Sequence, residues 1–65
     1  MPVVQINTHQ WDVARKRELV AKVTDAFVEL GVPRELVIIH ITEDDPANSA
    51  VGGVLMADLP PMPGA

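Results

Sequence analysis

The second residue of the chain is a proline whose nitrogen could do acid–base chemistry. Pro2 follows the initiator methionine and leads into the apolar run of residues 3–7. Methionine is commonly removed when the next side chain is small, and its removal here would expose a secondary amine. A free α-amino group titrates at about 7.7–8.0, and burial against apolar neighbours would lower that pKa. Such an amine suits proton transfer at carbon. The alternative is that Pro2 merely begins an edge strand, where proline is tolerated.

Other groups that could carry chemistry each have a structural alternative. His40 lies inside an apolar stretch, where it could be catalytic or could be a core or interface histidine bonded to the backbone. Ser49, His40 and Asp44 or Asp45 could form a serine–histidine–acid set, but nothing places the serine on a strained elbow. Trp11 could anchor an interface or pack at the start of a helix. The residue types alone leave these alternatives open.

Composition argues against several classes of function. The chain has 65 residues, a formal net charge of −4 and five Lys and Arg residues, too few to build a nucleic-acid surface. Cysteine is absent, the two histidines lie far apart, and residues 43–45 lack the spacing of further oxygen ligands. We therefore expect no metal or other cofactor. No apolar run is long enough to span a membrane and no charged leader is visible, which favours a cytoplasmic protein.

The elements that would position these groups follow a β-α-β pattern. Residues 3–8 predict a strand with Val4, Ile6 and Thr8 on one face. Asp12 is a plausible N-cap for a helix that Gly31 ends. Residues 36–42 predict a second strand that is nearly all apolar and is expected to be covered on both faces. The crossover makes the two strands parallel. The predicted inner stripe of the helix comprises Val13, Lys16 or Arg17, Leu19, Val20, Val23, Ala26, Phe27 and Leu30.

The last third of the chain predicts short structures that need partners. An acidic, proline-broken loop over residues 43–49 precedes the tight Gly52-Gly53 turn. The apolar segment around this turn is long enough to pair with the sheet edge of a neighbour. We divide the chain into a domain over residues 1–56 and a proline-rich tail over 57–65, either disordered or laid on another subunit. Because so short a chain buries little surface alone, oligomerisation is expected.

The order of these motifs resembles the small 4-oxalocrotonate tautomerase-like subunits of the tautomerase superfamily. The resemblance covers roughly residues 2–56. It is carried by Pro2, by Lys16-Arg17-Glu18-Leu19-Val20 in the helix, by Pro33, by Val37-Ile38-Ile39-His40-Ile41-Thr42-Glu43, and by Asn48-Ser49-Ala50-Val51-Gly52-Gly53. It implies an α+β, MIF-like fold: one β-α-β unit with a short C-terminal hairpin and two parallel strands per subunit, assembled into a multi-subunit sheet barrel. It also implies a homohexamer, a trimer of dimers, with Pro2 as general base.

Three site residues that the family usually places around the proline differ in this sequence. Family members that act on dicarboxylates carry an arginine in the loop after the first strand, which here is His9-Gln10-Trp11-Asp12. A second arginine is replaced by Ile38, and an aromatic residue before the Gly-Gly turn is replaced by Ser49. Arginine grips a carboxylate with a planar fork, which isoleucine cannot do. Candidate substrate-binding residues are therefore Trp11, Arg15, Arg34, Ile38, His40 and Ser49.

The resemblance implies an isomerase that interconverts enol and keto forms of a small unsaturated 2-oxo acid or a related carbonyl compound. The replacements favour a less charged, more apolar substrate. Alternatives are a subunit of a hetero-oligomeric enzyme that supplies the missing groups, and a related proline-dependent hydratase, dehalogenase or decarboxylase. A further alternative is a non-catalytic structural or binding module.

Overall fold

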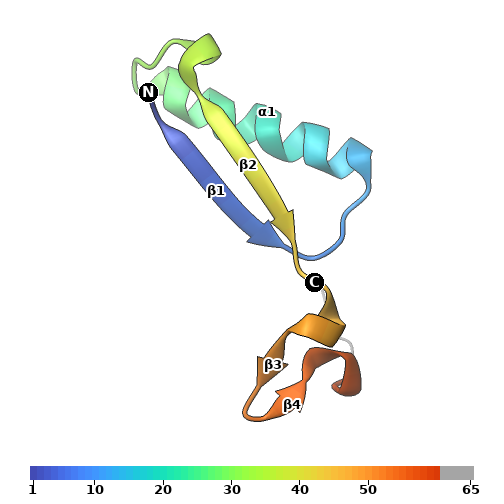
Figure 1. Cartoon of the computed structure of the whole chain (residues 1–65). Helices are drawn as coiled ribbons and strands as arrows, with labels where there is room; N and C mark the ends of the chain where they lie inside the picture. The colour runs from blue at the N-terminus through green and yellow to red at the C-terminus, as the bar shows by residue number, and fades with distance from the viewer. Residues whose placement is uncertain (61–65) are drawn as a thin grey trace.

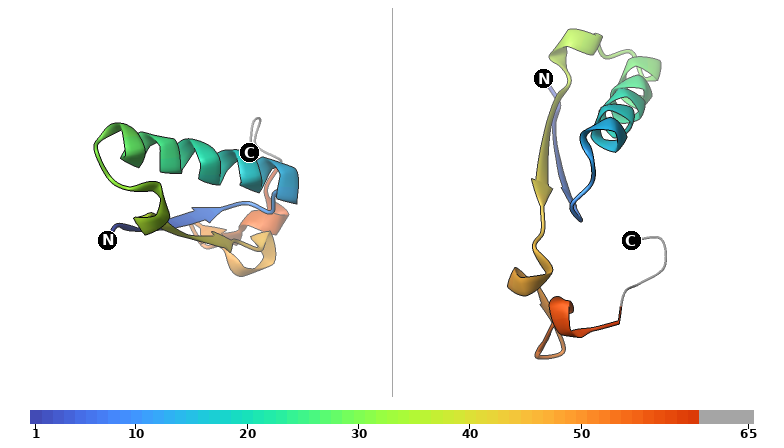
Figure 2. Two further views of the ribbon diagram at one scale, coloured as in Figure 1. Left: turned by 90° about the horizontal axis from the view of Figure 1, so that it is seen from above. Right: turned by 90° about the vertical axis from the view of Figure 1, so that its right-hand side faces the viewer.

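The computed structural model describes residues 1–60 and is built around a β-α-β unit (Figure 1). Strand β1 spans Val3–Thr8, helix α1 spans Val13–Glu29 and strand β2 spans Ile38–Glu43. The two strands are parallel, with Val3 beside Ile38 and Thr8 beside Glu43. Helix α1 runs back along one face of this two-stranded sheet (Figure 2). The predicted α+β unit with two parallel strands is confirmed.

Only one face of the sheet is covered by α1. In β1 the side chains of Val4, Ile6 and Thr8 are half-buried, as the alternation predicts. In β2, Ile39 and Ile41 lie on this same covered side. The opposite side, here called the open sheet face, is exposed. One chain therefore covers only one face of β2. That both faces are covered stays a prediction, which only an assembly of chains could fulfil. The open sheet face consists of Val3, Gln5, Asn7, Ile38, His40 and Thr42.

Helix α1 begins and ends where the sequence predicts. Asp12 caps it, because its Oδ1 accepts a hydrogen bond from the Arg15 N–H at 2.7 Å. At the other end Gly31 has a φ of 94°, which favours glycine and ends the helix. The half-buried residues that face the sheet are Lys16, Leu19, Val20, Val23, Thr24 and Phe27.

Four members of the predicted stripe lie outside this inner face. Val13 and Leu30 are 57% and 82% exposed, and Arg17 and Ala26 are also exposed. Val13 and Leu30, at the two ends of the helix, are not covered by the sheet because the lengths differ. A 17-residue helix is about 26 Å long, whereas a six-residue strand is about 20 Å long. The helix therefore overhangs the sheet. Of the two alternatives predicted for the inner face, Lys16 and Arg17, the structure places Lys16 there. Its ammonium pairs with Glu43 at the end of β2.

The second strand starts two residues later than the sequence predicts. Residues Arg34–Leu36 form a 3-10 turn, η1, and β2 begins at Ile38. The turn is closed by the Leu36 N–H, which donates to the Pro33 carbonyl at 3.0 Å, and by the Val37 N–H, which donates to the Arg34 carbonyl at 3.2 Å. These bonds occupy the backbone groups that a longer strand would have needed.

The C-terminal part is a small hairpin that stands away from the β-α-β unit (Figure 1). The turn η2 (Pro46–Asn48) leads into β3 (Ala50–Val51), which pairs antiparallel with β4 (Val54–Leu55) before η3 (Met56–Asp58). η3 crosses the predicted boundary at residue 56. The predicted division into two parts stays a prediction, and residues 61–65 of the tail lie outside the described residues.

Residues 1–60 enclose no core. None of them is fully buried, and the chain extends 43 × 21 × 16 Å with a radius of gyration of 15.0 Å. A compact chain of 65 residues would have a radius of about 11 Å. Much of the exposed apolar surface lies on the hairpin and just beyond it, where Val51, Val54, Leu55 and Leu59 are 60%, 41%, 43% and 38% exposed.

The turn between β3 and β4 depends on glycine. Gly52 and Gly53 have φ of 60° and 84°, the signs that a two-residue hairpin with the matching twist requires. A Cβ at Gly52 would meet no atom within 4 Å, so an added side chain costs only backbone strain. We expect Gly52→Ala to lower the free energy of unfolding by about 1 kcal/mol, measured in urea at fixed protein concentration. Gly52→Asn should cost less, because asparagine tolerates this conformation. Equal losses in both variants would contradict a conformational cause.

Candidate functional site

Pro2 lies immediately before β1 and is attached to β2. Its carbonyl accepts a hydrogen bond from the Ile38 N–H at 3.1 Å. The proline is half-buried, whereas Met1 is 78% exposed and projects beyond the sheet. With Met1 present the proline nitrogen is part of an amide and cannot accept a proton. Removal of Met1 would leave an amine on a residue that the sheet already holds in position.

Ile38 and His40 lie on the open sheet face, in the half of β2 that follows the bond to Pro2. Ile38 is beside Val3, and His40 is beside Gln5 one step further along the strands. Both side chains point to the exposed side, and Ile38 is 36% exposed. The structure therefore brings an apolar side chain and an imidazole to the same face of the strand that anchors the proline.

Arg34 lies near this end of the sheet but is engaged elsewhere. It belongs to η1, just before β2, and its Nη2 pairs with Oδ1 of Asp25 on α1. A guanidinium that already faces a carboxylate must leave it before it can hold a second one. Arg34 is thus near Pro2 but not free of a counter-ion.

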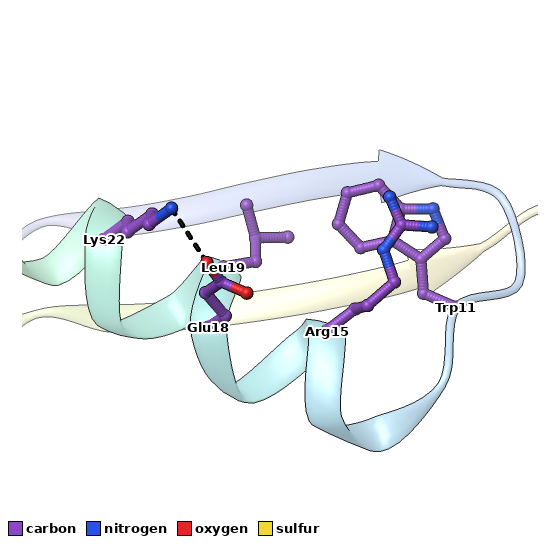
Figure 3. Close-up of a pocket in the computed structure, with 5 residues that line it drawn as sticks. All are labelled: Trp11, Arg15, Glu18, Leu19 and Lys22. Atoms are coloured by element: carbon purple, nitrogen blue, oxygen red, sulfur yellow. Dashed lines mark ion pairs between the residues drawn. The ribbon is translucent and has the colours of Figure 1, made fainter. Parts of the chain in front are cut away.

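Trp11 and Arg15 lie at the opposite end of the β-α-β unit, where β1 ends and α1 begins (Figure 1). The guanidinium carbon of Arg15 is 4.3 Å from the centroid of the Trp11 ring, and Figure 3 shows the guanidinium over the ring. The indole Nε1 of Trp11 is buried and has no hydrogen-bond partner within residues 1–60.

The stacked pair borders a cavity of about 240 Å³. Its other lining residues are Glu18, Leu19 and Lys22 of α1 (Figure 3). The Lys22 ammonium lies 2.9 Å from Glu18 Oε1. Hydrogen bonding to Lys22 lowers the pKa of the Glu18 carboxyl, and the same contact raises the pKa of Lys22. Both side chains therefore remain charged and paired at neutral pH.

Ser49 is separate from both groups. It lies between η2 and β3, and its carbonyl accepts from the Met56 N–H at 2.7 Å. The hairpin follows the carboxyl end of β2, whereas Pro2 lies at the amino end. Within one chain the predicted site residues thus occupy three places: Pro2 with Ile38, His40 and Arg34; Trp11 with Arg15; and Ser49 alone.

Four residues that lie beside the predicted site residues were not predicted from the sequence as part of a site. Glu18 and Lys22 are four apart on a helix, a spacing that predicts an ion pair, and Leu19 belongs to the predicted inner stripe. Asp25 and Arg34 are nine residues apart in different elements, so no local pattern announces their pairing.

No three histidine, aspartate or glutamate side chains within residues 1–60 are grouped as metal ligands would be. Over the same residues, no helix is long and apolar enough to cross a membrane. The cytoplasmic location stays a prediction.

Comparison with known proteins assigns the chain to a family. The model of a family described as tautomerase enzyme matches residues 2–59. The chain belongs to the tautomerase family. A search of curated protein sequences found no match.

Solved structures agree with this assignment. DmpI from Archaeoglobus fulgidus is 38% identical, with a TM-score of 0.77 over 88% of this tautomerase chain and 100% of its own. YwhB, a homologue of 4-oxalocrotonate tautomerase, is 31% identical, with a TM-score of 0.81 over 91% of this chain and all of its own. A further 4-oxalocrotonate tautomerase homologue is 33% identical, with a TM-score of 0.81 over 94% of this chain and 100% of its own. The tautomerase is therefore 4-oxalocrotonate tautomerase-like, and its function is of the tautomerase type.

Proposed function

We propose that this tautomerase uses the amine of Pro2, exposed by removal of Met1, to interconvert enol and keto forms of a small unsaturated 2-oxo acid. The observation that carries the proposal is the hydrogen bond of 3.1 Å from the Ile38 N–H to the Pro2 carbonyl, which fixes the half-buried proline at the start of β1. A base that is fixed before substrate arrives loses little entropy in the reaction.

One amine suffices for both proton transfers. The Pro2 nitrogen takes the proton of the enol hydroxyl, and the O–H electron pair stays on the oxygen of an enolate. That pair then forms the carbonyl π bond while the carbon–carbon π pair takes the proton back from the prolinium nitrogen. The enol loses a proton at oxygen and gains one at carbon, and the amine is regenerated. The reaction therefore needs no co-reactant.

The surroundings of Pro2 support this role at neutral pH. Val3 follows Pro2 in β1, Ile38 lies beside Val3 in β2, and both are apolar. Apolar neighbours disfavour the protonated amine, so its pKa should fall below that of a free α-amino group. His40, further along the same face, could polarise the carbonyl of the substrate.

We propose that copies of the chain associate through the open sheet face and the hairpin into a homohexamer, a trimer of dimers whose sheets form a barrel. The absence of a core within residues 1–60 and the exposed apolar residues of the hairpin support association. A hetero-oligomer with a second tautomerase-like chain is the alternative, and it is favoured if the pure chain remains a monomer.

Two measurements on purified protein test the function. Intact-mass analysis should show loss of Met1, and the ketonisation of a phenyl-substituted enolpyruvate should be faster than in buffer. The rate should rise with pH as the amine loses its proton. A retained Met1, or a rate equal to that of buffer, would overturn the proposal.

A further inference from the structure

The open sheet face carries no fixed charge, although the chain as a whole is acidic. The formal net charge is −4, yet none of the nine acidic and five basic residues lies on this face. Glu43, at the end of β2, alternates onto the covered side and pairs there with Lys16 of α1. Of the six side chains of the open sheet face, only that of His40 can gain a charge near neutral pH.

The nearest ionised groups lie beyond the two ends of this face. Asp44 follows β2 and is four residues from His40, which is about 13 Å along an extended chain. Arg34 and Glu35 belong to η1, which precedes β2, and the N-terminal amine precedes β1. The charged residues of α1 lie over the other side of the sheet (Figure 2). Within residues 1–60, therefore, the open sheet face presents no counter-ion for a charged imidazole.

A second copy of the chain is the occupant that fits this face. Two chains that each carry a charge of −4 repel one another least where neither presents a charge. Gln5, Asn7 and Thr42 carry amide and hydroxyl groups, which both donate and accept hydrogen bonds. Such groups can pair with their own copies across a twofold axis. Val3 and Ile38, which are 56% and 36% exposed, would be removed from water by the same contact.

The protonation state of His40 decides whether this residue suits such a contact. A neutral imidazole has one donor and one acceptor nitrogen, whereas an imidazolium has two donors, no acceptor and a positive charge. Between two copies the imidazolium would leave water without a carboxylate on the face to pair with. The separated chain therefore binds the proton more readily than the assembly does. By linkage, the assembly is stable where the imidazole is neutral and weakens as the pH falls.

We propose that His40 makes the assembly of this tautomerase sensitive to acid, because protonation of its imidazole separates copies that associate through the open sheet face. This inference rests on the association proposed above. The general charge of the chain acts in the opposite direction. Its pI is near 4.8, so mild acid brings the net charge towards zero and reduces the repulsion between copies. Separation in mild acid would therefore have a specific cause.

The dissociation of the native protein can be measured by analytical ultracentrifugation of dilution series at pH 7.5 and pH 5.5. Imidazoles titrate at about pH 6.5, so each chain takes up about one proton between these conditions. The protein concentration at the midpoint of dissociation should therefore be about 10-fold higher at pH 5.5. A midpoint that does not rise would overturn the acid sensitivity alone. A monomer at pH 7.5 would overturn the proposed association as well.

Two glutamine variants assign the effect to one histidine. His40→Gln keeps a donor and an acceptor but cannot be protonated, so its two midpoints should agree within about twofold. His9→Gln removes the other histidine, which is exposed in the loop between β1 and α1, and should keep the 10-fold difference. Each ratio compares one variant with itself, so a uniform effect on stability cancels. A 10-fold rise in His40→Gln, or its loss in His9→Gln, would contradict the assignment to His40.

A lysine at the same position supplies the charge at both pH values. His40→Lys should dissociate at pH 7.5 at least as readily as the native protein does at pH 5.5, and its midpoint should not depend on pH. An assembly of this variant at pH 7.5 as tight as the native one would overturn the proposal. Because the readout is mass rather than activity, the result does not depend on Pro2. It would stand even if the function proposed for the proline failed.

Discussion

Pro2→Ala is expected to lower kcat for enol ketonisation by about 100-fold or more. Alanine also permits removal of Met1, so the variant still exposes an amine. That amine is primary and sits on a freely rotating residue, whereas the proline ring fixes the direction of its nitrogen lone pair. The carbonyl of residue 2 still reaches the Ile38 N–H, so the strand should keep its register. Steady-state kinetics should show a fall in kcat with little change in KM, since the substrate is held by other groups.

The matched control is Pro33→Ala, which makes the same chemical change at a distant position. Pro33 precedes η1, and its carbonyl accepts from Leu36, a bond that alanine can also make. This variant should keep kcat within about twofold, with a small loss of stability from the freer unfolded chain. Retention of full activity by Pro2→Ala, or an equal loss in Pro33→Ala, would refute the catalytic role of the N-terminal proline.

Val51→Asp is expected to dissociate the assembly. In a single chain Val51 is 60% exposed, so a carboxylate there would cost little. If the hairpin packs on a neighbour, each copy instead loses about 1.5–3 kcal/mol of apolar burial and must also desolvate a charge. This loss is repeated at each equivalent contact. Light scattering after gel filtration should show a shift from oligomer to monomer, together with a lower Tm.

Val13→Asp provides the control for this effect. Val13 is 57% exposed and also β-branched, but it lies in the first turn of α1, where a negative charge is favourable. This variant should keep the native mass and Tm. An unchanged mass in Val51→Asp would show that the hairpin is not part of the interface, and equal dissociation by both variants would indicate a general charge effect.

Features of the fold with a local cause were predictable from sequence. The alternation in residues 3–8 gave the covered face correctly, and Asp12 and Gly31 marked the ends of the helix. The prediction that Val13 and Leu30 lie on the covered side of the helix was wrong. Periodicity indicates which residues share a side of a helix, but it does not indicate how far the sheet beneath the helix extends. That limit is set by β1 and β2, which are shorter than α1.

The candidate site was less accessible to sequence reasoning. Pro2 stands out by its position, and Ile38 and His40 share a face because they are two apart in a strand. The engagement of Arg34 by Asp25 depends on how η1 folds back on α1, which no spacing reveals. Arg15 and Trp11 are four apart, a helical spacing, but Trp11 precedes the helix, so their stacking required the structure.

The absence of a core within residues 1–60 has a consequence for the thermodynamics of the proposed assembly. If the proposed assembly completes the apolar interior, the chain folds and associates in one equilibrium. Its Tm then rises with protein concentration, and dilution alone favours the unfolded chain. If the proposed hexamer is the active form, the amount of active enzyme would vary more steeply than the amount of polypeptide. Halving the synthesis of the chain would then remove more than half of the assembled sites once the concentration nears the dissociation midpoint.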